Sequence, residues 1–97
     1  MTRIELHDAD SNDYETLHSE MKEKGFDKTI KNNDNKEYHL PNGEYYFNEP
    51  IQKHPTKKDY EIVLERAQSA AEKTKKKFSI ITSRADVINW YKLEPVN

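Results

Sequence analysis

The stretch TKKDYEIVLERAQSAA, residues 56–71, contains the clearest secondary-structure signal in the chain. Apolar residues recur there at positions i, i+3, i+4, i+7 and i+11 with charged residues between them: Tyr60, Val63, Leu64, Ala67 and Ala71. This spacing places them on one face of an α-helix. Thr56-Lys57-Lys58-Asp59 fits a capping box, in which a hydroxyl and a carboxylate each accept a hydrogen bond from an unpaired backbone N–H. The sequence therefore predicts that an amphipathic helix begins at this box.

A second helix is predicted nearer the N-terminus. Ser11 or Asn12 can cap it, and Tyr14, Leu17 and Met21 fall on one face. Gly25 is expected to end it.

Short strands are predicted on both sides of these helices. Residues 2–8 alternate between apolar and polar side chains, as in a strand with one buried face. A weaker strand is expected over residues 26–31, an aromatic strand over 44–47 and a last strand over 78–82. Residues 83–86 (Ser-Arg-Ala-Asp) form a second capping box, which predicts a short C-terminal helix with Val87, Trp90 and Tyr91.

The order of these elements is βαββαβ followed by a terminal helical turn. It predicts an α+β fold with one ferredoxin-like domain over residues 1–97: a four-stranded antiparallel sheet with two helices on one face and a short C-terminal helix. Residues 33–43 leave two alternatives. They either pair locally as a hairpin through Pro41-Asn42-Gly43 or form a long connection between the second and third strands.

Composition narrows the classes of function. The 97 residues are 35% charged and carry a net charge of only −2, which excludes a strongly basic nucleic-acid clamp and leaves only a local basic patch for such a contact. The absence of Cys excludes disulfides and thiolate zinc sites. With no long apolar run and no signal-peptide pattern, we expect a cytoplasmic protein that does not enter a membrane.

Three residues are candidates for chemistry. Asp8 lies where the first strand should end, and a carboxylate there could hold Mg²⁺ or a water beside a phosphate. The alternative is that the acidic residues near it only stabilise a helix N-terminus. His18 titrates near neutrality and is expected to be half exposed on the first helix. Tyr45 belongs to the aromatic strand, one face of which is core while the other could stack unpaired bases.

Four stretches resemble the GhoS-type antitoxin endoribonucleases and their uncharacterised relatives. These are small ferredoxin-like proteins similar in fold to the nuclease-like subunit of CRISPR adaptation complexes. The matches are His7-Asp8 at the end of the first strand, residues 17–21 with Gly25-Phe26, residues 40–48 with Tyr45 at an aromatic position, and residues 80–91. In the second stretch, His18 occupies a position that can be Arg in the family. The resemblance implies metal-assisted or acid–base cleavage of single-stranded RNA, such as a toxin message.

The leading hypothesis is therefore a single-stranded-RNA-binding protein, for which the resemblance further implies the activity of an endoribonuclease. In it, His18, Lys22 and Lys28 hold phosphate, Tyr45 stacks a base, and Asp8 orients a metal ion or water. It requires no cofactor and allows Mg²⁺ at Asp8.

The rival hypothesis is a non-enzymatic module that binds a protein or forms a homodimer. It rests on the net negative charge of residues 1–25, which contain three basic and seven acidic residues and would repel phosphate. The sequence does not decide between a monomer and a homodimer.

Overall fold

Residues 1–84 and 88–96 are described by the computed structural model. In chain order, the elements are β1 (Thr2–Leu6), α1 (Ser11–Glu23), β2 (Phe26–Asp27), β3 (Thr29–Lys31), β4 (Glu37–His39), β5 (Glu44–Phe47), α2 (Asp59–Glu72) and β6 (Phe78–Thr82). Among the helices of these residues, none combines the length and the apolar character needed to cross a bilayer.

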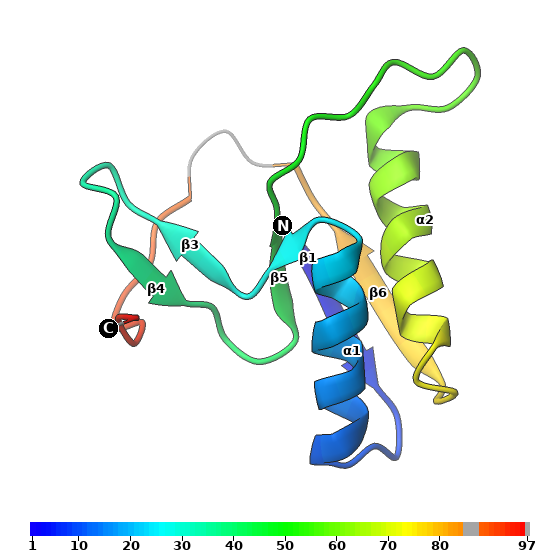
Figure 1. Cartoon of the computed structure of the whole chain (residues 1–97), viewed down its shortest axis with the longest axis horizontal. Coiled ribbons are helices and arrows are strands. Elements are labelled where there is room, and N and C mark those ends of the chain that lie inside the picture. Colours follow the sequence, from blue (N-terminus) through cyan, green and yellow to red (C-terminus); the bar gives the residue numbers. More distant parts are fainter. Residues whose placement is uncertain (85–87, 97) are drawn as a thin grey trace.

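Four strands form the main sheet, in the order β2-β5-β1-β6 with every neighbouring pair antiparallel. Both helices lie against one face of this sheet (Figure 1). The alternation predicted for the first strand explains why: Ile4 and Leu6 are buried beneath the helices, whereas Arg3 and Glu5 are exposed on the other face. The predicted α+β fold, with a four-stranded antiparallel sheet and two helices, is confirmed.

The first helix begins one or two residues earlier than the predicted caps, Ser11 or Asn12, would place it. Asp10 is the N-cap: its carboxylate accepts a hydrogen bond from the Asp13 N–H, and the Asp13 carboxylate accepts one from the Asp10 N–H, both at 3.0 Å. Leu17 and Met21 are fully buried, as their spacing predicted. Lys24 follows as the C-cap and Gly25 has a positive φ of 93°.

The predicted capping box of the second helix is wrong in position. The helix starts at Asp59 with Lys58 as N-cap, and the Glu61 carboxylate accepts a hydrogen bond from the Lys58 N–H at 3.3 Å. Thr56 instead donates its backbone N–H to Nδ1 of His54 at 3.1 Å, in the turn that precedes the helix. The buried face consists of small residues, which let the helix lie close to its neighbours: Ala67, Ala70 and Ala71.

A second, two-stranded sheet departs from the predicted plan. The single strand expected over residues 26–31 is broken at Lys28 into β2, which joins the main sheet, and β3, which pairs with β4. The Asn32 side-chain oxygen closes the turn between β3 and β4 by accepting the N–H groups of Asp34 and Lys36 at 2.9 and 3.0 Å. The hairpin alternative for residues 33–43 is therefore wrong, because the chain pairs backward through this turn. These residues belong instead to the connection between β2 and β5 of the main sheet, and that connection contains β4.

The predicted C-terminal helix is not present in residues 88–96, while Ala85, Asp86 and Val87 lie outside the described residues. The chain runs beside β4 instead. The His39 N–H donates to the Glu94 carbonyl at 2.8 Å, and the Val96 N–H donates to the Glu37 carbonyl at 2.9 Å. Backbone pairing with β4 competes with helix formation here, and Trp90 packs its ring 5.5 Å from that of Tyr38.

Candidate functional site

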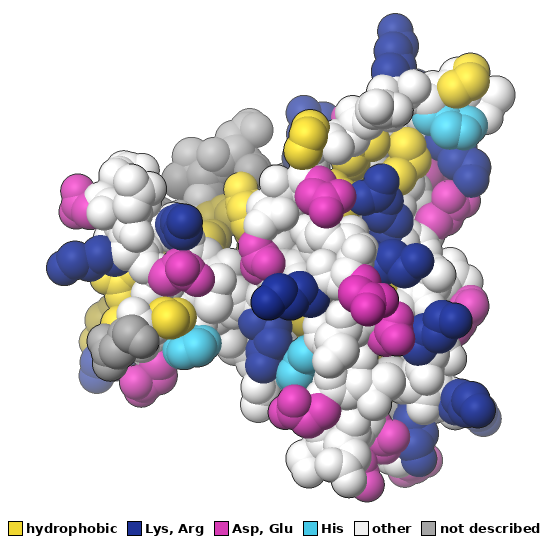
Figure 2. Space-filling view, in the orientation of Figure 1, with side chains coloured by type: hydrophobic (Ala, Val, Ile, Leu, Met, Phe, Trp, Pro, Cys, Tyr) yellow, Lys and Arg dark blue, Asp and Glu magenta, His cyan; other side chains and the backbone are white. Residues whose placement is uncertain are grey.

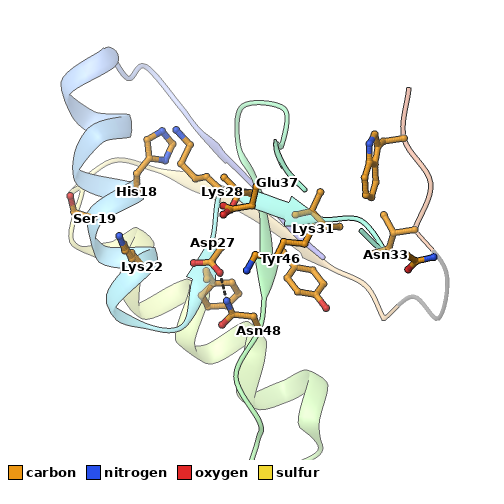
Figure 3. A pocket seen from close by; sticks show the side chains of 15 residues that line it. His18, Ser19, Lys22, Asp27, Lys28, Lys31, Asn33, Glu37, Tyr46 and Asn48 are labelled. Carbon is orange, nitrogen blue, oxygen red and sulfur yellow. Dashed lines mark hydrogen bonds between the residues drawn. The ribbon is translucent and has the colours of Figure 1, made fainter. Parts of the chain in front are cut away.

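A groove of about 950 Å³ lies between α1 and the second sheet. One wall comes from α1, through His18 and Lys22, and the other comes from residues 28–31 and the C-terminal segment with Trp90 (Figure 3). Tyr46 of β5 also lines it. The break at Lys28 creates the groove, because it turns β3 and β4 away from the main sheet.

The groove gathers positive charge in a chain that is slightly acidic. Lys22, Lys28 and Lys31 line it together with Asp27 and Glu37, which leaves a local excess of one positive charge against −2 for the whole chain. Figure 2 shows Lys and Arg side chains beside a histidine in the region between the helices and the second sheet. Asp27 is engaged by the Asn48 side-chain amide, which donates a hydrogen bond to its carboxylate.

His18 is held by a buried tyrosine. The Tyr45 hydroxyl lies 2.6 Å from Nδ1 of His18, and its side chain has no solvent exposure. Burial, with a smaller effect of Tyr14, raises the pKa of Tyr45 far above its ordinary value, so the hydroxyl keeps its proton. Within the described residues, this hydroxyl forms a hydrogen bond only with His18. We therefore assign Tyr45 as the donor and His18 Nδ1 as the acceptor.

This bond fixes which nitrogen of His18 carries the proton. Burial lowers the pKa of His18, the nearby Lys28 ammonium lowers it further, and Glu15 opposes both. The imidazole is thus neutral at neutral pH, with Nδ1 occupied and the proton on Nε2. Figure 3 shows the His18 ring beside the Lys28 side chain. The pair offers one N–H donor and one ammonium to an anionic group.

The predicted stacking role of Tyr45 is wrong, because its ring is completely buried and has no face for a base. Tyr45 pairs with Thr2 of β1, and this register turns it toward the helices. The next residue, Tyr46, points to the opposite face, is 36% exposed and lines the groove. The alternation of the strand predicts that the two tyrosines lie on opposite faces of the sheet. Which of the two faces is open to solvent follows only from the pairing of β5 with β1.

Asp8 is not part of the groove. It lies exposed in the connection between β1 and α1, with a positive φ of 51°. The structure therefore brings together His18, Lys22 and Lys28 and leaves Asp8 apart from them. Over residues 1–84 and 88–96, His, Asp and Glu side chains form no group of three or more that could hold a metal ion. Mg²⁺ at Asp8 stays a prediction.

Sequence analysis missed several groove residues. Lys31 and Tyr46 come from separate sheets, and Trp90 reaches the groove from the C-terminal segment. The turn at residues 32–35 was the available signal for Lys31, since a turn between two short polar-aromatic runs favours a hairpin.

Comparison with known proteins gives no match: no family model fits the chain, and no curated protein or solved structure is similar to it.

Proposed function

We propose that this protein binds single-stranded RNA in the groove between α1 and the second sheet. The observation that carries the proposal is that three lysines, a neutral histidine N–H and the partly exposed ring of Tyr46 line one groove. Proteins that bind single strands combine a positively charged groove, which follows the phosphates, with aromatic rings on which bases stack.

Each group has a definite part in this proposal. Lys22, Lys28 and Lys31 neutralise phosphates, and His18 donates its Nε2–H to a phosphate oxygen. Tyr46 stacks a base in the place first assigned to Tyr45. Among the groove's polar groups, the Asp27 and Glu37 carboxylates are acceptors for base N–H groups and for the 2′-hydroxyl, which distinguishes RNA from DNA.

Two finer predictions accompany this proposal. The order β2-β5-β1-β6, with α1 and α2 on one face, supports a ferredoxin-like sheet into which the β3–β4 hairpin is inserted between the second and third sheet strands. Cleavage of the bound RNA stays a prediction from the resemblance. The geometry supports His18 as a phosphate donor more directly than as a base, because its Nδ1 is occupied and its Nε2 is protonated.

The test is binding of a fluorescein-labelled, short U-rich RNA, measured by fluorescence anisotropy over a range of salt concentrations. The variant Lys22→Gln/Lys28→Gln/Lys31→Gln should bind more weakly, and the slope of log affinity against log salt should fall by about 2, since each phosphate contact on a single strand contributes about 0.7. The matched control replaces three exposed lysines after α2 in the same way: Lys73, Lys75 and Lys77.

Two further arms make the result decisive. Tyr46→Ala should lose about 1–3 kcal/mol of binding free energy if a base stacks on its ring. The DNA strand of the same sequence should bind more weakly than the RNA. Equal losses in the groove variant and in its control would refute the proposal, as would an RNA that does not bind the parent protein.

A further inference from the structure

His18 and Lys28 line a second hollow as well as the groove. This hollow has a volume of about 540 Å³ and lies between β1, the first half of α1 and the turn at Asn42-Gly43. Arg3 and Tyr14 are among its other lining residues. The two hollows therefore meet at one pair of side chains.

We infer that this second hollow is a further nucleotide site, and that an RNA strand passes from the groove across His18 and Lys28 into it. The inference rests on the proposed function and adds the path of the strand. The phosphodiester that joins the two nucleotides lies at the shared boundary, where the His18 Nε2–H and the Lys28 ammonium meet it.

The backbone fixes this boundary. Lys28 is the only residue between β2 and β3, and its carbonyl accepts the Leu40 N–H at 2.8 Å. The Tyr45 hydroxyl holds His18 from the opposite side. The His18 ring and the backbone of Lys28 are therefore held in place before any ligand arrives, which reduces the entropy lost on binding.

The second hollow differs in chemistry from the groove. Its volume lies in the range of about 300–1,000 Å³ that holds ligands of nucleotide size. Arg3 supplies a planar donor for the next phosphate, and the Asn42 amide supplies both a donor and an acceptor for a base edge. The Tyr14 hydroxyl accepts the Leu6 N–H at 3.1 Å, which leaves its own O–H as a further donor. Recognition here relies on hydrogen bonds, whereas the groove relies on stacking.

The carboxylates around the boundary determine where a phosphate is favoured. Glu5 and Glu15 line the second hollow together with Arg3 and Lys28, so this hollow has no net charge. A phosphate is therefore favoured at the His18–Lys28 boundary and at Arg3, and a base or ribose is favoured between them.

The experiment compares uridine monophosphate with a U-rich RNA several nucleotides long, by amide NMR titration of the whole chain. The mononucleotide should shift the groove amides, such as Lys31 and Tyr46, whereas the longer RNA should also shift Asn42 and Gly43. Arg3→Gln should lower the salt slope for the longer RNA by about 0.7, the contribution of one phosphate contact, and leave the mononucleotide shifts unchanged. The control is Arg84→Gln, which removes an exposed arginine beyond the end of β6.

The outcomes separate this inference from the proposed function. If the longer RNA shifts the groove amides but not Asn42 or Gly43, and Arg3→Gln behaves like Arg84→Gln, the second site is wrong while RNA binding in the groove stands. If neither probe shifts any amide, both proposals fail. If the longer RNA shifts both sets and only Arg3→Gln reduces the slope, the strand path is supported.

Discussion

Replacing Tyr45 with Phe removes one atom, the hydroxyl oxygen that holds His18. The ring stays in the core, where Tyr45 has no exposure, so the apolar contacts of the side chain are retained. A net hydrogen bond contributes about 0.5–1.5 kcal/mol, and an acceptor left fully buried would cost more. His18 is only partly buried, so water can replace the lost donor. We therefore expect Tyr45→Phe to lower the free energy of unfolding by about 1 kcal/mol.

Thermal and urea unfolding, followed by circular dichroism, measure this loss. For a domain of this size, 1 kcal/mol corresponds to a decrease in Tm of about 4–8 °C. Tyr46→Phe is the matched control, because it removes the same atom from the neighbouring exposed residue and should change stability by less than about 0.5 kcal/mol.

The same variant tests the protonation state of His18. Long-range ¹H–¹⁵N NMR should show the proton on Nε2 in the parent protein, and a mixture of both tautomers in Tyr45→Phe, because nothing then favours a lone pair on Nδ1. A parent protein with the proton on Nδ1 would refute the donor assignment. Equal stability of Tyr45→Phe and the parent would refute the energetic argument.

Three further predictions concern stability. Thr2→Val should raise the free energy of unfolding by up to about 1 kcal/mol in urea titrations, because it removes a buried hydroxyl that has no hydrogen-bond partner; a loss of stability would show that the hydroxyl is paired. Gly43→Ala should destabilise more than Gly25→Ala. Both glycines have a positive φ, at 82° and 93°, which costs about 1–2 kcal/mol for Ala. A Cβ at Gly43 would in addition lie 2.7 Å from the Ile4 backbone oxygen, whereas a Cβ at Gly25 would meet only a flexible side chain. Equal losses of stability in the two variants would contradict this prediction. Stability should fall as the pH drops below about 6.5, because His18 has a lowered pKa when folded and the unfolded chain therefore binds more protons; His18→Asn should flatten this part of a urea-unfolding pH series, and an unchanged slope would exclude His18 as the cause.

The main sheet and its helices follow from periodicity. Alternation over residues 2–8 predicted which side of β1 is buried, and the spacing of Leu17 and Met21 predicted the buried side of α1. The stripe on α2 was predicted less well: Tyr60 and Leu64 are 65% and 40% exposed. The start of α2 lies toward the end that extends beyond the sheet in Figure 1, so residues at the correct helical spacing are only partly covered there.

The break that separates the second sheet from the main sheet could not be predicted from local sequence. No Gly or Pro marks the break at Lys28, and the break depends on partners distant in the chain: β5 takes Phe26, while β4 takes Ile30. The C-terminal segment changed for the same reason, since pairing with β4 replaced the helix suggested by its capping residues.

The candidate site was predicted in part. His18, Lys22 and Lys28, which the sequence-based hypothesis assigned together to phosphate, lie along one groove. Tyr45 was assigned to the wrong face because the sequence gives the alternation of a strand but not its absolute orientation. Asp8 was grouped with His18 because of the family resemblance and its place at the expected end of the first strand, but it lies exposed between β1 and α1 and does not line the groove.

The attachment of the second sheet divides the molecule into two parts of unequal cooperativity. Its contacts with the rest of the chain include backbone bonds to the C-terminal segment, such as that from the Val96 N–H to the Glu37 carbonyl, whereas Ile4 and Leu6 belong to the central core. Amide hydrogens of β4 should therefore exchange with solvent through local opening, and those of β1 only through global unfolding. Because the second sheet forms one side of the groove, a ligand that contacts both sides would slow amide hydrogen exchange in the second sheet. The amide exchange rates of the second sheet would then change most when a ligand binds.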